Sequence, residues 1–414
     1  MNIWYFSAYD QPKGKSSRTY DFAYQLVKKG HQVTMFTNSY CHWTQKEKLS
    51  KGEKWRIEIV DGIRVVWLRT FHYKGNGWQR GINMLTNIWR SMQASNTFKD
   101  KPVVVIGPSV PIGTGWVALM IAKKRKAAFV YEVRDVWPIA LVDDGGLSKK
   151  SFTYHVFRYL EKMLYQNSDR ISATMPFLHE HVTSSGGDSR IIEWMPNGVN
   201  FERFSGYSTY QGGEQCSLTA MYIGGFGTAH DVITIVRAAK ILQQQGNDKI
   251  KFIIIGDGPK RQTCIKEAES NGLKNIVFRD PVTKSDVPKA QMEADILMAS
   301  VLDSDAYRFG LNLNKIYDYF ASSRPVIFCG NAPNDPIDAS HAGYSLPPED
   351  PSALSKTLLS HMTLTSEERV GMGRRGNDYV RKEFDMSNLG ERMELLLIRA
   401  IEQNKSGYEA FRRA

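Results

Sequence analysis

The chain contains, twice, the order of an apolar strand, a glycine-containing loop, an amphipathic helix and a second apolar strand. The first strand spans residues 3–6, a polar loop with Gly14 follows, and a helical pattern over residues 20–29 ends at Gly30 before a strand at 32–37. Glycine just after the last helical position commonly terminates a helix. Because parallel strands need a crossover, usually a helix, this order predicts a βαβ unit that begins a doubly wound parallel sheet.

The pattern restarts in the second half of the chain, with a strand at 218–223, a glycine loop at 224–227, a helix at 232–245 and a strand at 251–255. Further buried-strand patterns occur at 103–106, 128–132, 170–173, 276–278, 296–298 and 326–328. A chain of 414 residues suits two domains. We predict one Rossmann-like domain over residues 1–203, a polar linker at 204–214, a second such domain over 215–385 and a C-terminal helical segment over 386–414.

The composition excludes several classes of protein. Lys plus Arg total 54 against 43 Asp plus Glu, and the net charge of +11 favours phosphorylated ligands, polyanions or anionic membranes. The basic clusters at 123–126 and 374–375 are not interleaved with aromatic residues, so no nucleic-acid partner is predicted. The four cysteines lack metal-binding spacing, and neither a signal peptide nor a window of about 18 apolar residues occurs. We therefore predict a cytoplasmic protein with free thiols.

The segment from Phe309 to Ile327 carries the strongest functional signal. A loop with Gly310 leads into a helix predicted to begin near Asn312, and Asp318 lies further along the same helix. Unpaired N–H groups and the dipole at a helix N-terminus can hold a phosphate, and an acid on the helix can accept hydrogen bonds from ribose hydroxyls. This combination favours a nucleotide site; the alternative is an ordinary amphipathic helix of an α/β domain.

Other glycines and cations follow neighbouring strands of the second domain. Ligands of doubly wound sheets lie beyond the carboxyl ends of the strands, and glycine lets backbone N–H groups approach an anion closely. Cations at this edge can neutralise a diphosphate. The residues concerned are Gly224, Gly225, Gly227, Gly256, Gly258, Lys260, Arg261 and Lys315. The alternative for each glycine is turn chemistry, and the segment 256–259 lacks the third glycine of a Rossmann fingerprint.

In the first domain, the corresponding loops contain Ser16, Ser17, Arg134, Asp135 and Trp137. Arg134 and Asp135 follow the strand that ends at position 132, so we expect both side chains to point toward a ligand. Asp135 can position an acceptor or a sugar, or act as a base. The alternative is that it caps a helix that begins near residues 137 and 138.

Motifs at residues 30–33, 133–138, 195–200, 222–227, 256–259 and 314–319 occur in the order found in one enzyme family. The chain resembles family 4 retaining glycosyltransferases of the GT-B fold. Within that family it is most similar to the branch with fucosaminyl- or N-acetylaminosugar-transferase members that build O-antigen or capsule repeats. The segments Pro196-Asn197-Gly198-Val199-Asn200 and Asn314-Lys315-Ile316-Tyr317-Asp318 are the most specific.

The resemblance implies two Rossmann-like domains facing across a cleft, with a C-terminal helix that crosses back to the first domain. It implies a nucleotide-sugar donor, UDP-linked, in the second domain and a lipid-linked or saccharide acceptor in the first. The reaction would be transfer with retention, without metal or other cofactor, in cell-surface polysaccharide biosynthesis. The catalytic candidates are Asp135, Arg261 and Lys315. The donor-binding candidates are Gly224, Gly225, Gly227, Gly256, Gly258, Lys260, Leu311, Asn312, Asn314 and the ribose-binding Asp318. The acceptor-binding candidates are Ser16, Ser17, Arg134 and Trp137.

The sequence departs from the family pattern at three positions. Many members have two glutamates eight residues apart, where this chain has Gly310 and Asp318. The basic residue that often follows the glycine loop is replaced by Thr228, so Lys260 or Arg261 is expected to supply that charge. Two rival interpretations remain: a catalytically degenerate nucleotide-sugar-binding partner protein, and a nucleotide-sugar epimerase of the same fold.

Residues 71–90 mix aromatic, aliphatic and cationic side chains. Such a segment can lie on an anionic membrane and admit a lipid-linked acceptor, which would make the protein peripheral on the inner face of the cytoplasmic membrane. The alternative is a loop followed by an amphipathic core helix.

Overall fold

A computed structural model describes residues 1–12, 14, 17–42, 44–75, 77–143, 146–214 and 217–413, with the side chains of all of these except residues 306 and 406–413. The chain divides into two compact units. The first combines Met1–Asn197 with Met386–Ala414, and the second is Gly198–Asp385. The C-terminal segment thus folds with the first unit.

The first unit is built on an eight-stranded sheet in the order β3-β4-β2-β1-β5-β6-β7-β8. Neighbouring strands are parallel except β3 and β4, which are antiparallel. The strands are β1 Asn2–Phe6, β2 Gln32–Asn38, β3 Trp55–Val60, β4 Ile63–Leu68, β5 Val104–Pro108, β6 Ala128–Val133, β7 Arg170–Ala173 and β8 Ile192–Trp194. The parallel order brings the loops after β1, β2, β4, β5 and β6 to one edge.

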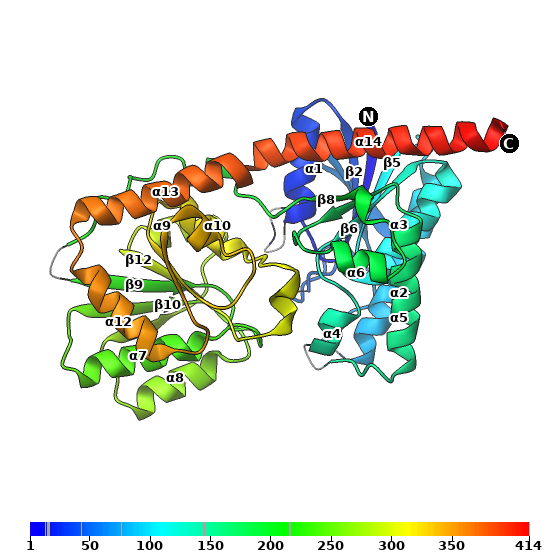
Figure 1. Ribbon diagram of the computed structural model, residues 1–414. Helices are drawn as coiled ribbons and strands as arrows, with labels where there is room; N and C mark the ends of the chain where they lie inside the picture. The colour runs from blue at the N-terminus through cyan, green and yellow to red at the C-terminus, as the bar shows by residue number, and fades with distance from the viewer. Residues whose placement is uncertain are drawn as a thin grey trace. The chain divides into compact units, whose positions relative to one another are not determined.

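Helices cover both faces of this sheet (Figure 1). Helices α1 (Arg18–Lys28) and α14 (Met386–Arg413) pack on one face, and α2 (Trp78–Thr97), α3 (Ile112–Arg125) and α5 (Phe152–Gln166) pack on the other. Shorter helices are α4 (Ile139–Asp143), α6 (His179–Ser184) and the 3-10 turn η1 (Ser189–Ile191). The apolar stripe of α14 is fully or almost fully buried in the core of this unit: Met386, Leu389, Met393, Leu396, Leu397 and Ala400.

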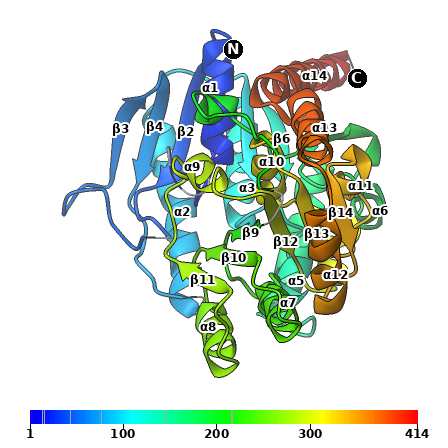
Figure 2. The same ribbon diagram turned by 90° about the vertical axis from the view of Figure 1, so that its left-hand side faces the viewer.

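The second unit has a six-stranded parallel sheet in the order β11-β10-β9-β12-β13-β14. Helices α7, α8 and α12 lie along one face, and α10, α11 and α13 along the other (Figure 2). The strands are β9 Leu218–Ile223, β10 Ile250–Ile255, β11 Ile276–Arg279, β12 Ile296–Ser300, β13 Val326–Cys329 and β14 Gly343–Leu346. The helices are α7 Val232–Gln244, α8 Arg261–Ser270, α9 Val287–Gln291, α10 Asn314–Ala321, α11 Pro336–Ser340, α12 Pro351–Met362 and α13 Ser366–Phe384, with 3-10 turns η2 Phe201–Phe204 and η3 Asp305–Phe309.

The stretch at 204–214, predicted as a polar linker, is mostly exposed but is anchored to the second unit near its end. Tyr210 is only 5% exposed. The guanidinium of Arg369, which is fully buried, donates to the carbonyl oxygens of Gly212 and Glu214, each at 3.2 Å. Composition alone does not reveal this anchoring, because Arg369 lies more than 150 residues further along the chain.

The sequence analysis missed β3, β4, β8 and β14. The hairpin of β3 and β4 turns at Asp61 and Gly62, both with positive φ, and an Asp-Gly pair between apolar runs is a recognised hairpin signal. Strands β8 and β14 span only three and four residues, too few for a periodicity to emerge. In the described part of the chain, no helix is both long and apolar enough to span a bilayer.

Candidate functional site

The glycine loops after β9 and β10 are joined through their main chains at the carboxyl edge of the second sheet. The N–H of Gly224 donates to Ile255 O at 3.0 Å, and the N–H of Phe226 donates to Asp257 O at 2.9 Å. Gly256 has φ +146°, and a Cβ there would lie 1.8 Å from Gly224 O. Gly258 has φ +150° and would meet the backbone of Phe226 at 2.8 Å. Only glycine permits this approach of the two loops.

Lys315, in the first turn of α10, reaches this pair of loops. Its Nζ donates to Tyr222 Oη at 2.7 Å and lies 4.2 Å from the centre of the same ring. A Cβ at Gly224 would lie 2.6 Å from this Nζ, so the ammonium occupies the space that the glycine leaves open. Burial lowers the pKa of Lys315 to about 7. A partly buried cation beside backbone glycines is suited to meet an anion.

His230 and Lys260 complete the surroundings of the first glycine loop. The N–H of Gly227 donates to His230 Nδ1 at 3.2 Å, which requires this nitrogen to be unprotonated. Burial, and then the charge of Lys315, lower the pKa of His230 to about 4. Lys260 Nζ donates to Thr228 O at 2.8 Å, so a second cation lies beside the residue that follows the glycine loop. The imidazole is therefore neutral, and the positive charge comes from the two lysines.

The structure places the other predicted donor residues in different settings. The N–H of Leu311 donates to Asn334 Oδ1 at 2.5 Å, and Asn334 Nδ2 donates back to Leu311 O at 3.3 Å. The main chain of Leu311 is thus held by two hydrogen bonds to Asn334, a residue that the sequence analysis did not select. Arg261 lies 3.3 Å from the carboxylate of Asp280. Asn312 precedes α10, Asn314 is its exposed first residue, and Gly225 is exposed in its loop.

Asp318 lies in the middle of α10, partly buried, and forms an ion pair. Arg203 Nη2, from η2, donates to Asp318 Oδ1 at 2.7 Å. Nothing in the local sequence around Arg203 predicted this partner, because the two residues are 115 positions apart.

In the first unit, the side chain of Arg134, which we expected to point toward a ligand, is engaged by buried acids. Its guanidinium contacts Asp10 and Glu132, each at 2.7 Å, and both acids are fully buried. Arg18 also pairs with Glu132, at 2.8 Å. Although burial opposes ionisation, the charges of Arg134 and Arg18 hold the pKa of Glu132 below its usual value. This network connects the loop after β6 to α1 and to the loop after β1, so Arg134 helps to hold these segments together at the edge of the sheet.

Asp135 is exposed at the same edge, and its carbonyl accepts from Ser109 Oγ at 2.8 Å and from the Trp137 N–H at 3.0 Å. Trp137 is only 5% exposed and packs near Phe157, which leaves little of its indole accessible to an acceptor. Ser17 is also buried, and its hydroxyl donates to Asp21 at 2.6 Å. Ser16 lies outside the described residues.

The sequence analysis did not select an aromatic cluster that follows β1, β2 and β4. Tyr73 Oη and His42 Nδ1 are 2.7 Å apart, and their rings are stacked with centroids 5.6 Å apart. The Tyr9 ring lies 5.6 Å from His42, and Arg80 lies over Tyr9 at 5.4 Å. The cluster shares the carboxyl edge of the first sheet with Asp135. Tyr9, His42 and Tyr73 lie in three loops separated by helices and strands, so the cluster offered no periodic signal.

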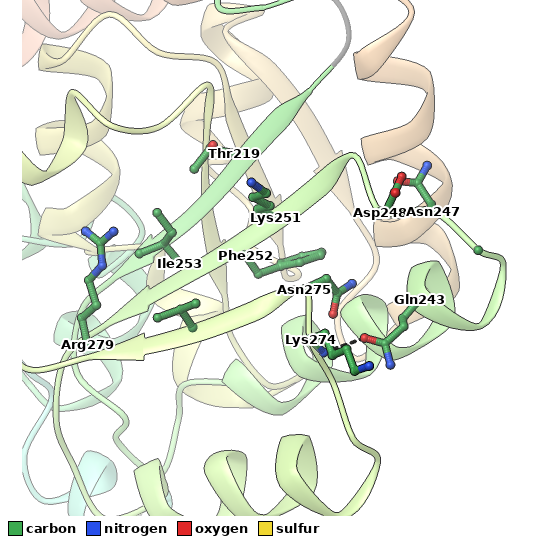
Figure 3. A pocket seen from close by; sticks show the side chains of 12 residues that line it. Thr219, Gln243, Asn247, Asp248, Lys251, Phe252, Ile253, Lys274, Asn275 and Arg279 are labelled. Atoms are coloured by element: carbon green, nitrogen blue, oxygen red, sulfur yellow. Dashed lines mark hydrogen bonds between the residues drawn. The ribbon is translucent and has the colours of Figure 1, made fainter.

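A cavity of about 450 Å³ lies elsewhere in the second unit (Figure 3). Its lining runs from Thr219, Lys251 and Asn275, near the beginnings of β9, β10 and β11, along β10 and β11 to Arg279 at the end of β11. The Lys274 N–H donates to Gln243 Oε1 at 2.6 Å beside it. It is separate from the glycine loops, which lie at the carboxyl ends. Among the described residues, no group of His, Cys, Asp and Glu side chains is arranged to hold a metal ion.

Two α/β units, each built on a largely or wholly parallel sheet with helices on both faces, define the GT-B-like fold. Solved structures agree: sucrose-phosphate synthase from Thermosynechococcus elongatus has a TM-score of 0.73 at 14% identity over 95% of this chain and 98% of that one. HepE from Anabaena, in complex with UDP and glucose, has a TM-score of 0.65 at 12% identity over 95% and 98%. WaaG, a glycosyltransferase involved in lipopolysaccharide biosynthesis, has a TM-score of 0.64 at 14% identity over 94% and 98%. At these identities the likeness concerns the fold.

The sequence itself identifies the domains. Residues 13–198 match the Glycosyl transferase 4-like domain, and residues 217–363 match Glycosyl transferases group 1. Together the two matches account for most of the chain. It is 22% identical over 250 residues to the probable glycosyltransferase WbjE of Pseudomonas aeruginosa, an alignment that covers 56% of this chain and 58% of that protein.

Proposed function

We propose that the protein is a retaining glycosyltransferase that moves a sugar from a UDP-sugar to a lipid-linked or saccharide acceptor in cell-surface polysaccharide biosynthesis. The observation that carries the proposal is the ammonium of Lys315, which is partly buried and lies against the glycine loop at Gly224. The two glycosyltransferase domains support the reaction class. The fold relative that holds UDP and glucose supports the donor, and the relative involved in lipopolysaccharide biosynthesis supports the pathway. We expect the transferred sugar to be an N-acetylaminosugar, as in the fucosaminyl-type branch of these enzymes.

In this proposal the second unit binds the donor. Lys315 and Lys260 face the diphosphate, the glycine loops let it approach their backbone N–H groups, and Asp318 accepts from the ribose hydroxyls. The bond between the anomeric carbon and the diphosphate oxygen breaks while an acceptor hydroxyl attacks that carbon, and the hydroxyl proton passes to the departing diphosphate. Stabilisation of the departing negative charge by fixed cations and dipoles is usually the largest contribution to such a rate. The exposed Asp135 and the aromatic cluster at Tyr9 and His42 lie on the acceptor side.

Product analysis by NMR, with and without acceptor, tests the proposal. A new glycosidic bond with the anomeric configuration of the donor is the expected result. An altered nucleotide sugar in the absence of acceptor would instead indicate an epimerase. Binding of UDP without turnover of any donor would indicate a degenerate partner protein.

Donor binding should depend on pH through Lys315. Its pKa of about 7 in the free protein must rise when a diphosphate binds, so binding takes up a proton above pH 7. The affinity for UDP is therefore expected to fall roughly five- to tenfold between pH 7.5 and 8.5. Calorimetry in buffers of different ionisation enthalpy measures the uptake. Lys315→Arg, which stays charged, should bind UDP with little pH dependence; equal slopes in both proteins would contradict the assignment.

We also propose that α2 holds the protein peripherally on the cytoplasmic face of an anionic membrane. Trp78, Leu85 and Trp89 are 73%, 66% and 53% exposed, and their spacing places them on one face of the helix. Changing all three to Ser is expected to reduce flotation with phosphatidylglycerol vesicles several-fold, because apolar burial in the interface is lost. The matched control changes Ile57 and Ile59, which are 46% and 69% exposed on β3. Unchanged flotation of the α2 variant would refute the membrane role.

A further inference from the structure

The ion pair of Arg203 and Asp318 joins the segment that enters the second unit to the helix that carries the proposed ribose acid. Arg203 belongs to η2, a single 3-10 turn that directly follows the motif at 196–200. Asp318 belongs to α10. The Nη2-to-Oδ1 distance is 2.7 Å, and the two side chains are 18% and 19% exposed.

Stability does not readily explain this pair. Arg203 Nε and Nη1 are buried, and neither has a hydrogen-bond partner among the described residues. A largely buried guanidinium that makes a single hydrogen bond leaves much of its desolvation cost uncompensated. An apolar pair of similar volume would often stabilise a protein as well or better. Unsatisfied buried donors of this kind call for another explanation.

The geometry at the carboxylate suggests that explanation. Arg203 contacts Oδ1, and in the described part of the chain Oδ2 of Asp318 accepts no hydrogen bond. One oxygen is therefore fixed by a cation while the other remains able to accept from a ligand. A carboxylate held in this way presents its second oxygen in a constant direction, without the loss of rotational freedom that a mobile side chain incurs on binding.

We infer that Arg203 is a positioning residue that holds the Asp318 carboxylate for the vicinal hydroxyls of a nucleotide ribose. The inference rests on the proposed function, since it takes a ribonucleoside diphosphate as the ligand of the second unit. Arg203 itself acts through Asp318. Without Arg203, the short aspartate side chain rotates among its rotamers, and the protein distinguishes ribose from deoxyribose less well.

The test compares the dissociation constants of UDP and 2′-deoxy-UDP for the wild-type chain and three variants: Arg203→Gln, Asp318→Asn, and both together. The wild-type protein is expected to prefer UDP by roughly tenfold or more, as is typical for a hydrogen bond to a charged group. Arg203→Gln should reduce this preference to within about threefold. The double variant should prefer UDP no less than Asp318→Asn alone does, because the effects of substitutions at coupled residues do not add.

Controls separate the possible failures. Arg279→Gln removes a more exposed ion pair with Glu293 in the same unit and should keep the full preference for UDP. Arg203→Lys keeps the charge and serves if the Gln variant does not fold; it too should lose most of the preference, because the lysine ammonium ends one bond short of the Nη2 atom that contacts Asp318. Full preference in the folded Arg203 variants, with loss in Asp318→Asn, would overturn the positioning role alone. Full preference in Asp318→Asn would also overturn the ribose assignment in the proposed function.

Discussion

Replacing Lys315 by Ala is expected to lower the rate of glycosyl transfer by about 100- to 1,000-fold, the loss typical when one group that stabilises a developing negative charge is removed. The ammonium lies against the glycine loop and has Tyr222 Oη as its hydrogen-bond partner. Burial already lowers the pKa of Lys315, and replacing the lysine by alanine leaves no uncompensated buried charge. The free energy of unfolding should therefore change by no more than about 1 kcal/mol.

Steady-state kinetics and denaturant unfolding measure the two parts of this prediction. Lys251→Ala, which removes an exposed lysine near the start of β10, is the matched control and should retain full turnover. Near-normal turnover of Lys315→Ala would mean that this ammonium does not face the leaving group.

Replacing Gly256 by Ala is expected to lower the free energy of unfolding by more than about 3 kcal/mol. The added Cβ would lie 1.8 Å from the carbonyl oxygen of Gly224, and φ of +146° is itself unfavourable for alanine. The contact is between main-chain atoms of the two loops, so neither loop can move without breaking the hydrogen bond between Gly224 and Ile255. Chemical denaturation measures the change. Gly81→Ala in α2, where a Cβ meets nothing within 4 Å, should be neutral or stabilising.

Gly224→Ala distinguishes the structural from the functional use of these glycines. Its Cβ would lie 2.6 Å from Lys315 Nζ, the far end of a flexible side chain that can move aside. The fold should survive, whereas turnover should fall as it does for Lys315→Ala, because the ammonium is displaced. Full activity in this variant would show that Gly224 does not determine the position of the Lys315 ammonium.

The sequence was informative where function depends on the backbone. Glycine after a buried strand marks the carboxyl edge of a parallel sheet, and Gly224, Gly256 and Gly258 meet there as their order predicts. Asp318 and Lys315 were placed on the helix by spacing alone. These inferences need only periodicity and the rule that parallel strands end at one edge.

Side-chain partners could not be obtained in this way. Tyr222 meets Lys315 across 93 positions of sequence, and Arg203 meets Asp318 across 115. Arg134 follows its strand as expected, but the buried acids Asp10 and Glu132 determine the direction of its guanidinium. Such pairings depend on which side chains come into contact when the chain folds, and no local sequence pattern encodes these long-range contacts.

A crystal structure of the full chain with UDP tests the central claim most directly. The account predicts the diphosphate within hydrogen-bonding distance of Lys315 Nζ, beside the glycine loops at Gly224 and Gly256, with the ribose hydroxyls at Asp318. A nucleotide bound away from these residues, with Lys315 still on Tyr222 alone, would contradict it.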